Sequence, residues 1–345
     1  MIHKINLKGL HLKDLEEFVC RFGEPPYRAR QIFSWIYGKG SLNFEDMTDI
    51  SKIFRYKLHQ EAYISALKLL SIKQSKIDGT RKFLFQLADG SKIESVLMFD
   101  DKRRTLCVST QVGCALDCKF CATGLMGLQR NLNAGEIVDQ FLTVQKIIKE
   151  KITNVVFMGM GEPLHNYANT IKAAEILTHS LGPNLAKRHL VISTSGLVPK
   201  IIRFADEGHK YRLAISLNAT TDEIRSRLMP LNKKWPIQVL LEAAQYYAQK
   251  SDEPVTFEYV LMEHINDSEA DALRLKQLVE NIRCKINLIP YNATDGPFRR
   301  PSEKRILKFY ERLASLKAPV TIRWSKGVDI EAACGQLVVQ DTISK

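Results

Sequence analysis

The chain has 345 residues with 45% apolar content, enough for a large buried core and for more than one compact unit. Seven cysteines are an odd and sparse set for this length, which argues against an extracellular disulfide scaffold and predicts a cytoplasmic location. No run of about 18 apolar residues occurs, so the sequence indicates neither a membrane span nor an export signal. The formal charge of +12 favours a polyanionic partner, for which nucleic acid is the simplest choice.

The N-terminal residues predict a small helical unit. Apolar residues recur at helical spacing in residues 12–22, 27–37 and 50–60, and the segments between them, rich in glycine and proline, are typical of turns. We therefore expect an accessory domain over residues 1–62.

The next segment changes to the two-residue period of β-strands. Residues 82–87 and 93–98 are strand-like, and Gly79 and Gly90, each preceded by aspartate, are typical of hairpin turns. A short antiparallel β meander is expected over residues 63–100, as an extension between the helical unit and the rest of the chain.

The remaining residues, 101–345, alternate between short apolar strands and amphipathic helices. Repeated βα units require parallel strands with helices outside, so an α/β fold with an open or closed barrel is predicted. In such barrels the C-terminal ends of the strands carry the active site. The expected strands are residues 105–111, 154–159, 189–194, 212–217, 255–261, 285–289 and 320–324.

Three cysteines, Cys114, Cys118 and Cys121, lie on one short loop after the first of these strands. Three thiolates on one loop can hold three irons of a four-iron cluster and leave the fourth iron without a protein ligand. Zinc is an alternative, but it needs a fourth ligand, and His165 is too far along the chain for a compact site. A redox dithiol would use only the last two cysteines and leave the first without a role.

The C-x3-C-x2-C spacing, with Phe120 before the last cysteine, resembles the radical S-adenosylmethionine (SAM) superfamily. In that superfamily the open iron of a [4Fe-4S] cluster holds the amino and carboxylate groups of SAM. The resemblance implies SAM-binding residues at the ends of successive strands, although each of them alone is also typical of an ordinary turn or cap. The candidates are Gly161, Glu162, Ser193, Ser216, Leu217, Asn218 and Asn292.

Two further cysteines make the resemblance more specific. Cys107 and Cys334 look like the paired catalytic cysteines of the bacterial dual-specificity RNA (adenine-carbon-2) methyltransferases, whereas without the family they would be interpreted as buried apolar residues. Cys20 and Cys284 match no family motif and are expected to be structural. Similar segments cover nearly the whole chain: residues 27–32, 113–124, 159–164, 193–199, 287–292 and 334–337.

The resemblance implies a radical SAM fold, a partial (β/α)6-type barrel, and RNA substrates. These are an adenine near the peptidyl transferase centre of 23S ribosomal RNA and the adenine just after the anticodon of some transfer RNAs. A base must leave its stack, or start in a loop, for such chemistry. Basic clusters on several loops fit an RNA partner, as do candidate contacts in the helical unit, although Trp35 has the spacing of a core residue. These contacts are Tyr27, Arg28, Arg30 and Trp35.

The resemblance also implies the reaction. Carbon 2 of adenine is electron-poor and cannot attack the methyl group of SAM as a nitrogen would, so a radical route is needed. Cys334 would take a methyl group from one SAM by nucleophilic displacement, and a radical derived from a second SAM would abstract hydrogen from the methylthioether. The carbon radical would add to adenine. After loss of the carbon-2 proton, Cys107 would attack the sulfur of Cys334, releasing the product and leaving a disulfide.

The base for the carbon-2 proton is either Glu94 or Cys107. Glu94 matches a carboxylate proposed for this role in the family, but from the sequence alone it is equally an outward polar residue of an alternating strand. The scheme further implies a one-electron reductant of the flavodoxin type and a thiol reductant. We expect a monomer that does not bind a membrane.

Two other functions stay open. A sister enzyme that methylates carbon 8 of the same ribosomal adenine shares the cluster and both cysteines, although Glu162-Pro163 and residues 193–196 look more like the carbon-2 group. A non-enzymatic, zinc-stabilised RNA-binding protein is the alternative of another class. Asn218 and Thr220 stand where the family usually has histidine and proline, and we expect SAM binding to survive because asparagine can donate and accept hydrogen bonds.

Overall fold

The computed structural model of the chain describes residues 4–294 and 296–339. Its main element is a curved sheet whose parallel strands pair in chain order, so that each new strand is added at the same edge. This is the arrangement that repeated βα units produce. The parallel strands are β6 (Arg103–Cys107), β9 (Asn154–Phe157), β10 (Leu190–Thr194), β11 (Arg212–Ser216), β12 (Val255–Leu261), β13 (Cys284–Pro290) and β14 (Val320–Ile322).

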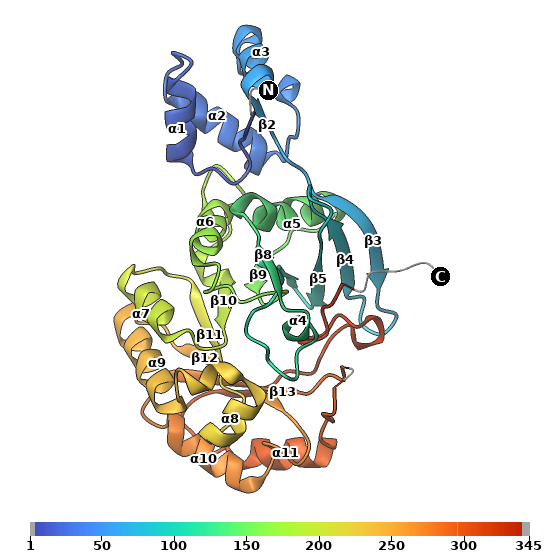
Figure 1. The fold of residues 1–345 in the computed structure, drawn as a ribbon, viewed down its shortest axis with the longest axis vertical. Helices are drawn as coiled ribbons and strands as arrows, with labels where there is room; N and C mark the ends of the chain where they lie inside the picture. Colours follow the sequence, from blue (N-terminus) through green and yellow to red (C-terminus); the bar gives the residue numbers. More distant parts are fainter. Residues whose placement is uncertain (1–3, 295, 340–345) are drawn as a thin grey trace.

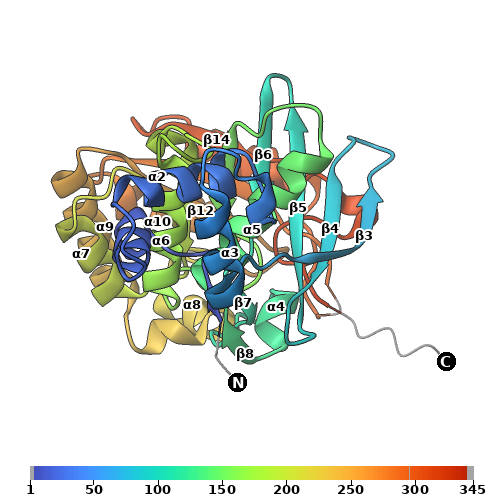
Figure 2. The ribbon, with the colours of Figure 1, turned by 90° about the horizontal axis from the view of Figure 1, so that it is seen from above.

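Helices after successive strands cover the outside of the sheet, as Figures 1 and 2 show. The predicted βα alternation is therefore confirmed, and with it the partial barrel. Figure 1 shows α7, α9 and α10 along one outer side of the molecule. The barrel helices are α5 (Ala134–Ile147), α6 (Tyr167–Thr178), α7 (Val198–Asp206), α9 (Ile237–Ser251), α10 (Glu269–Val279) and α11 (Glu303–Arg312).

The ends of these helices follow from local capping chemistry. Asn133 and Ser268 each open a helix with a capping box, in which the side chain accepts from the third residue and that residue's carboxylate accepts in return. The short α8 (Asp222–Leu228) was not predicted, because its seven residues contain too little apolar periodicity to be recognised. Across the described ranges, no helix has the length and apolar character needed to span a membrane.

The β meander is present and extends the barrel sheet. It consists of β3 (Lys68–Gln74), β4 (Arg81–Gln86) and β5 (Lys92–Asp100), which pair antiparallel in this order. The last of them, β5, pairs antiparallel with β6 of the barrel sheet. Gly79 and Gly90 both have positive φ, +74° and +87°, as the predicted hairpin turns require.

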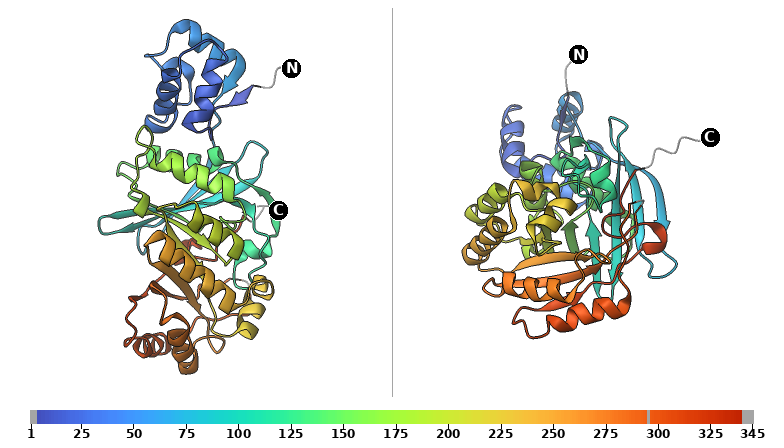
Figure 3. Two further views of the ribbon diagram at one scale, coloured as in Figure 1. Left: turned by 90° about the vertical axis from the view of Figure 1, so that its left-hand side faces the viewer. Right: turned by 60° about the horizontal axis from the view of Figure 1, so that its bottom comes forward.

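The N-terminal residues form a helical lobe, which Figures 1 and 3 show beside α5 and α6. Its core is continuous with the core of the barrel, since its buried side chains belong to the same hydrophobic cluster. The strands that open and close it pair parallel. The elements are β1 (Ile5–Asn6), α1 (Leu12–Cys20), α2 (Tyr27–Phe33), a π-helical turn (Ser34–Gly38), a 3-10 turn (Phe44–Asp46), α3 (Lys52–Glu61) and β2 (Ala62–Tyr63).

A buried ion pair fixes the helical lobe to the barrel. Lys8 Nζ donates to Asp139 Oδ1 of α5 at 2.5 Å, and the Leu67 amide donates to Asp139 Oδ2 at 2.6 Å. Both charged side chains are 3% exposed. Next to them, Gly9 has φ +94°, and a Cβ on it would lie 2.6 Å from the nitrogen of Gly135. The lobe is therefore docked by backbone contact and buried charge, not tethered loosely.

We expect Lys8→Met to lower the free energy of unfolding by about 3–5 kcal/mol, because it leaves the buried Asp139 carboxylate without its cation. The double variant Lys8→Met with Asp139→Leu should recover part of this loss, since it removes both charges. Lys146→Met, an exposed lysine on the same helix, is the matched control and should change stability by less than about 0.5 kcal/mol. Denaturant unfolding measures all three. A loss equal to that of the control would show that the pair does not hold the lobe.

Candidate active site

The cysteine loop lies between two short strands outside the barrel sheet. The strand β7 (Gln111–Gly113) pairs antiparallel with β8 (Leu128–Asn131), and α4 (Ala122–Leu125) directly follows Cys121. Gly113 has φ +74°, and a Cβ on it would lie 1.8 Å from the Gly127 carbonyl oxygen, so only glycine fits at the base of the loop. The predicted strand 105–111 is therefore too long, because the chain leaves the sheet at Cys107 to form this hairpin.

The three loop thiols lie in an enclosed region and influence one another. Burial raises the pKa of Cys118, and the neighbouring thiols Cys121 and Cys114 raise it further. Burial also raises the pKa of Cys114 to about 12. Thiolates gathered in this way need bound cations to stay ionised.

The arrangement of these thiols fits a cluster better than a single ion. A zinc site would require four ligands on one ion, whereas ligands of a cubane each bind a different iron. Three thiols on one loop suit a four-iron cluster, in which each thiolate would bind a separate iron.

Glu162 lies buried beside the cysteine loop. Its carboxylate accepts from the Ser195 amide at 2.8 Å and from the Leu164 amide at 3.1 Å. Burial raises its pKa to about 7, although these backbone donors oppose the shift. Gly161, with φ +99°, packs so closely on Gln111 that a Cβ would lie 2.5 Å from that side chain. A carboxylate fixed this firmly can receive an ammonium group next to the cluster.

Three other predicted SAM contacts lie at the C-terminal ends of β10 and β11: Ser193 within β10, Ser216 as the last residue of β11, and Leu217 directly after it. Ser193 Oγ donates to the Phe157 carbonyl of β9 at 2.6 Å, and its side chain is half-buried, so its lone pairs stay available. Ser216 is also half-buried, whereas Leu217 is completely buried. The two serines can therefore bind a ligand through side-chain oxygen, and Leu217 can contribute only shape or backbone.

The two asparagines in the predicted set differ. Asn218 adopts φ +56°, is 1% exposed, and its Oδ1 accepts from the Val260 amide at 2.9 Å. Its side chain is therefore already engaged by the protein. Asn292 donates through Nδ2 to the Cys334 carbonyl at 3.1 Å, while its buried Oδ1 has no partner among the described residues. An orphaned buried acceptor at this position fits an amino group of a ligand.

Arg225 of α8 was missed in the sequence analysis. It is 1% exposed, and its guanidinium donates to the carbonyl oxygens of Ser195, Ser216 and Leu217 at 2.7, 3.1 and 3.0 Å. Burial lowers its pKa to about 10. One side chain thus ties together the ends of two neighbouring strands that carry predicted SAM contacts. No local signal distinguishes it from a solvated helix arginine.

Cys107 and Cys334, far apart in sequence, are brought together. Burial raises the pKa of Cys107, and Cys334 raises it further, so the two sulfurs are electrostatic neighbours. Both are free thiols. Cys107 is buried, whereas Cys334 is exposed to solvent. Cys121, a predicted cluster ligand, also acts on Cys334.

Glu258 and Arg323 accompany Cys334 and were not predicted. Glu258, on β12, is 6% exposed; its Oε1 accepts from Asn287 Nδ2 at 2.9 Å, and its buried Oε2 has no partner within the described ranges. Arg323 NH1 lies 3.9 Å from Glu258 Oε1. The sequence offers a signal for Glu258, because a carboxylate is unusual in a strand that is buried on both faces.

Glu94 is not an outward polar residue. It is 6% exposed, its Oε1 lies 3.2 Å from Lys82 Nζ, and its Oε2 accepts from the Val338 amide at 3.2 Å. Burial raises its pKa, although the Lys82 ammonium opposes this shift. The carboxylate therefore faces the C-terminal segment that carries Cys334, which excludes the solvent-facing interpretation.

Two family models match the chain. The model described as the ribosomal RNA large subunit methyltransferase N-terminal domain matches residues 5–64, and that of the radical SAM superfamily matches residues 108–275. The chain is 48% identical over 332 residues to a probable dual-specificity RNA methyltransferase RlmN of Thermotoga maritima, covering 96% of this chain and 97% of the relative. It is 46% identical over 334 residues to the dual-specificity RNA methyltransferase RlmN of Geobacter sulfurreducens, with 96% and 92% covered.

A solved structure agrees with these matches. The crystal structure of a radical SAM methyltransferase from Sphaerobacter thermophilus superposes with a TM-score of 0.91 at 45% identity, covering 96% of this chain and 99% of that protein. The chain belongs to the RlmN family of dual-specificity RNA methyltransferases, within the radical SAM superfamily.

Proposed function

We propose that this chain methylates carbon 2 of adenine, in 23S ribosomal RNA at the peptidyl transferase centre and in some transfer RNAs just after the anticodon. The observation that carries the proposal is that the segment around Cys334 lies against the cysteine loop, since the Ala122 amide donates to the Gly335 carbonyl at 2.8 Å. The electrostatic effect of Cys334 on Cys107 supports the same location for Cys107. A methyltransferase that used only nucleophilic chemistry would need neither the paired thiols nor the cluster loop. The names of the relatives above support the two classes of RNA substrate.

Cys114, Cys118 and Cys121 would hold a [4Fe-4S] cluster, and Gly161, Glu162, Ser193, Ser216 and Asn292 would hold SAM beside it. When bound, cluster and SAM supply a one-electron cleavage that generates the oxidant for hydrogen abstraction. The protein residues position this chemistry: Arg225 fixes the strand ends, and the orphaned Asn292 oxygen offers an acceptor. Leu217 and the backbone of Asn218 would complete the contact surface.

Cys334 is proposed as the methyl carrier. Its thiolate would attack the methyl carbon of SAM, so that a sulfur–carbon bond forms on Cys334 while the bond from the methyl carbon to the sulfonium sulfur breaks and S-adenosylhomocysteine leaves. Because its side chain is solvent-accessible, the methylated form can reach the base. Carbon–carbon bond formation would leave a radical on the adenine ring, which would lose one electron to the oxidised cluster and its carbon-2 proton to Glu94 or Cys107. The Cys107 thiolate would then attack the sulfur of Cys334 and free the RNA, and a thiol reductant would reopen the disulfide.

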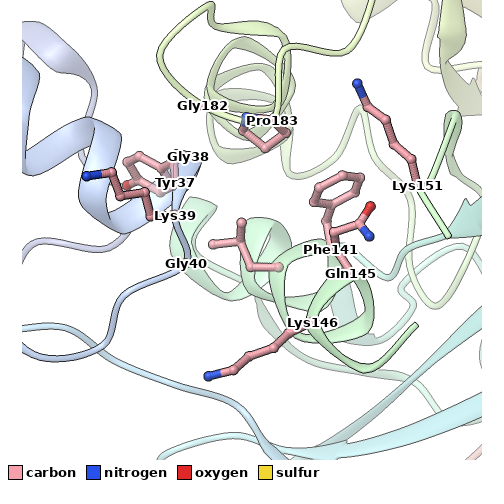
Figure 4. A pocket seen from close by; sticks show the side chains of 11 residues that line it. Tyr37, Gly38, Lys39, Gly40, Phe141, Gln145, Lys146, Lys151, Gly182 and Pro183 are labelled. Carbon is pink, nitrogen blue, oxygen red and sulfur yellow. The ribbon is translucent and has the colours of Figure 1, made fainter. Parts of the chain in front are cut away.

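The RNA is proposed to bind across the helical lobe as well as the barrel. A groove of about 340 Å³ separates the lobe from α5 and is lined by Lys39, Lys146 and Lys151 (Figure 4). Within the described residues none of the three makes an ion pair, and Lys39 instead lies 3.3 Å above the ring of Trp35. Unpaired cations around a groove next to an aromatic ring suit an RNA backbone.

We expect Lys146→Gln with Lys151→Gln to weaken RNA binding and to lower the slope of log affinity against log salt by up to about 2, because two phosphate contacts are lost. The turnover number at saturating RNA should not change. The matched control is Lys285→Gln with Lys317→Gln, in a second groove of about 340 Å³ that also contains Glu280. Fluorescence anisotropy with transfer RNA at several salt concentrations compares them. Equal effects in both double variants would show only a response to total charge.

We propose a separate role for each of the three parts of the chain. Residues 1–62 would bind RNA, residues 63–100 would link and extend the barrel, and residues 101–345 would form the catalytic core. We also propose a cytoplasmic monomer that receives electrons from a flavodoxin-like donor. Mass spectrometry of nucleosides from treated RNA tests the central proposal: 2-methyladenosine supports it, and 8-methyladenosine would instead identify the sister activity.

A further inference from the structure

We propose that Lys82, a buried lysine of the β meander, is a positioning residue that holds the segment around Cys334 in place. This segment, residues 326–338, is named the catalytic tail. The inference rests on the proposed role of Cys334, and it assigns to the meander a task beyond linking two domains. Figure 1 shows the tail, in red, running back beside β4 and β5, and Figure 2 shows the same proximity from above.

The ammonium group of Lys82 contacts both Glu94 and the backbone of the catalytic tail. Its side chain is 5% exposed. The Nζ atom lies 3.2 Å from Glu94 Oε1 and donates to the Glu331 carbonyl at 3.1 Å. The other oxygen of Glu94 accepts from the Val338 amide at 3.2 Å. The buried ion pair between Lys82 and Glu94 therefore contacts the backbone on both sides of Cys334, three residues before it and four residues after it.

The backbone of the catalytic tail adopts conformations that are unfavourable for most residues. Glu331 adopts φ +54°, a left-handed conformation that is unfavourable for a residue with a side chain. Gly327 and Gly335, on either side, also have positive φ, +64° and +85°. Apart from one 3-10 turn (Val328–Ile330), the tail has no regular secondary structure up to residue 339. Its internal hydrogen bonds close only short turns, such as that from the Ala332 amide to the Gly327 carbonyl at 2.9 Å, so contacts from other elements also hold its conformation.

The hairpin turn of the meander adds two further contacts at the start of the tail. Asp78 Oδ2 accepts from the Gly327 amide at 2.8 Å, and the Lys76 amide donates to Asp329 Oδ2 at 3.0 Å. The opposite side of the tail meets the cluster helix, where the Ala122 amide donates to the Gly335 carbonyl at 2.8 Å. The tail is thus clamped between the meander and the residue that follows the last cluster cysteine.

Burying a lysine is costly, so the contacts that only a charged side chain can make are the ones that explain its presence. An apolar side chain would fill the same position without the desolvation of two charges. The ion pair does what an apolar side chain cannot, since it presents a donor to the strained Glu331 carbonyl and an acceptor to the Val338 amide. The lysine therefore sets where Cys334 stands relative to Cys107 and the cluster loop.

Hydrogen exchange followed by mass spectrometry tests the proposal on the full-length protein with its cluster reconstituted. In Lys82→Met, amides of the catalytic tail should exchange about tenfold faster relative to barrel peptides, as expected for the loss of a hydrogen bond to a charged group. The matched control is Lys68→Met. Lys68 is an exposed lysine on β3 of the same meander, so the control removes one charge away from the tail.

Lys82→Met with Glu94→Gln separates positioning from charge burial. It removes the uncompensated carboxylate, so a general loss of stability should be relieved while fast exchange in the tail persists. If tail and barrel peptides accelerate by the same factor in both variants, or if the tail is unchanged, Lys82 does not position it. This readout needs neither RNA nor turnover, so it stands even if the proposed carbon-2 methylation proves wrong.

A kinetic readout distinguishes positioning from RNA binding. Because Lys82 is buried, Lys82→Met should lower kcat for RNA methylation by roughly 10- to 100-fold and leave the KM for RNA unchanged. A raised KM with unchanged kcat would contradict the proposal, since it would assign Lys82 to the RNA-binding surface.

Discussion

The Cys334→Ala protein is expected to transfer no methyl group to RNA, with activity reduced at least about 10⁴-fold, because the methyl carrier itself is removed. The cluster should be unaffected, since Cys334 is not among its proposed ligands. Anaerobic assays with radiolabelled SAM measure the transfer, and iron analysis verifies the cluster. Protein-bound label should disappear together with RNA-bound label.

Cys20→Ala and Cys284→Ala are the matched controls for this experiment. Cys20 is exposed on α1, and Cys284 is buried on β13, so between them they reproduce the loss of an accessible and of a buried thiol. Both should keep near-normal methyl transfer. Residual turnover by Cys334→Ala would remove the covalent-carrier scheme, even if the cluster and SAM cleavage were intact.

Cys107→Ala is expected to stop the reaction one stage later. Without the thiol that attacks the sulfur of Cys334, the RNA should stay covalently attached to the protein after carbon–carbon bond formation. The structure supports this because Cys107 is the buried electrostatic neighbour of Cys334. Denaturing gel electrophoresis should show a protein–RNA species that survives reducing agent and disappears with nuclease.

The double variant Cys107→Ala with Cys334→Ala is the control, and it should give no adduct. If Cys107→Ala releases methylated RNA at the normal rate, another group resolves the intermediate. If it forms neither adduct nor product, Cys107 acts earlier, and its proposed alternative role as the base for the carbon-2 proton gains support.

Most of the fold could be predicted from the sequence because its signals are local and repeated. Each parallel strand is a short apolar run followed by an amphipathic helix, and this alternation alone defines the barrel. The β meander could also be predicted from the sequence, because Gly79 and Gly90 mark its two hairpin turns. The elements that were missed are short, such as α8, where packing and not periodicity decides the helix.

The candidate site was only partly predictable. The cysteine spacing indicates a cluster, but pairing Cys107 with Cys334 needed the family resemblance, because residues this far apart meet only in the folded chain. Arg225 and Lys82 could not be found in the sequence. A buried cation and an exposed one look alike until the tertiary contacts are known. Glu94 was ambiguous for the same reason, since strand alternation does not say which face the tail covers.

The proposed radical mechanism is tested most directly by anaerobic reconstitution of the wild-type chain with iron and sulfide, followed by reduction in the presence of SAM and RNA. We expect brown protein with about four irons per chain, and production of 5′-deoxyadenosine that requires Cys114, Cys118 and Cys121. A colourless, zinc-containing protein that leaves SAM intact would contradict this mechanism and would favour the RNA-binding alternative.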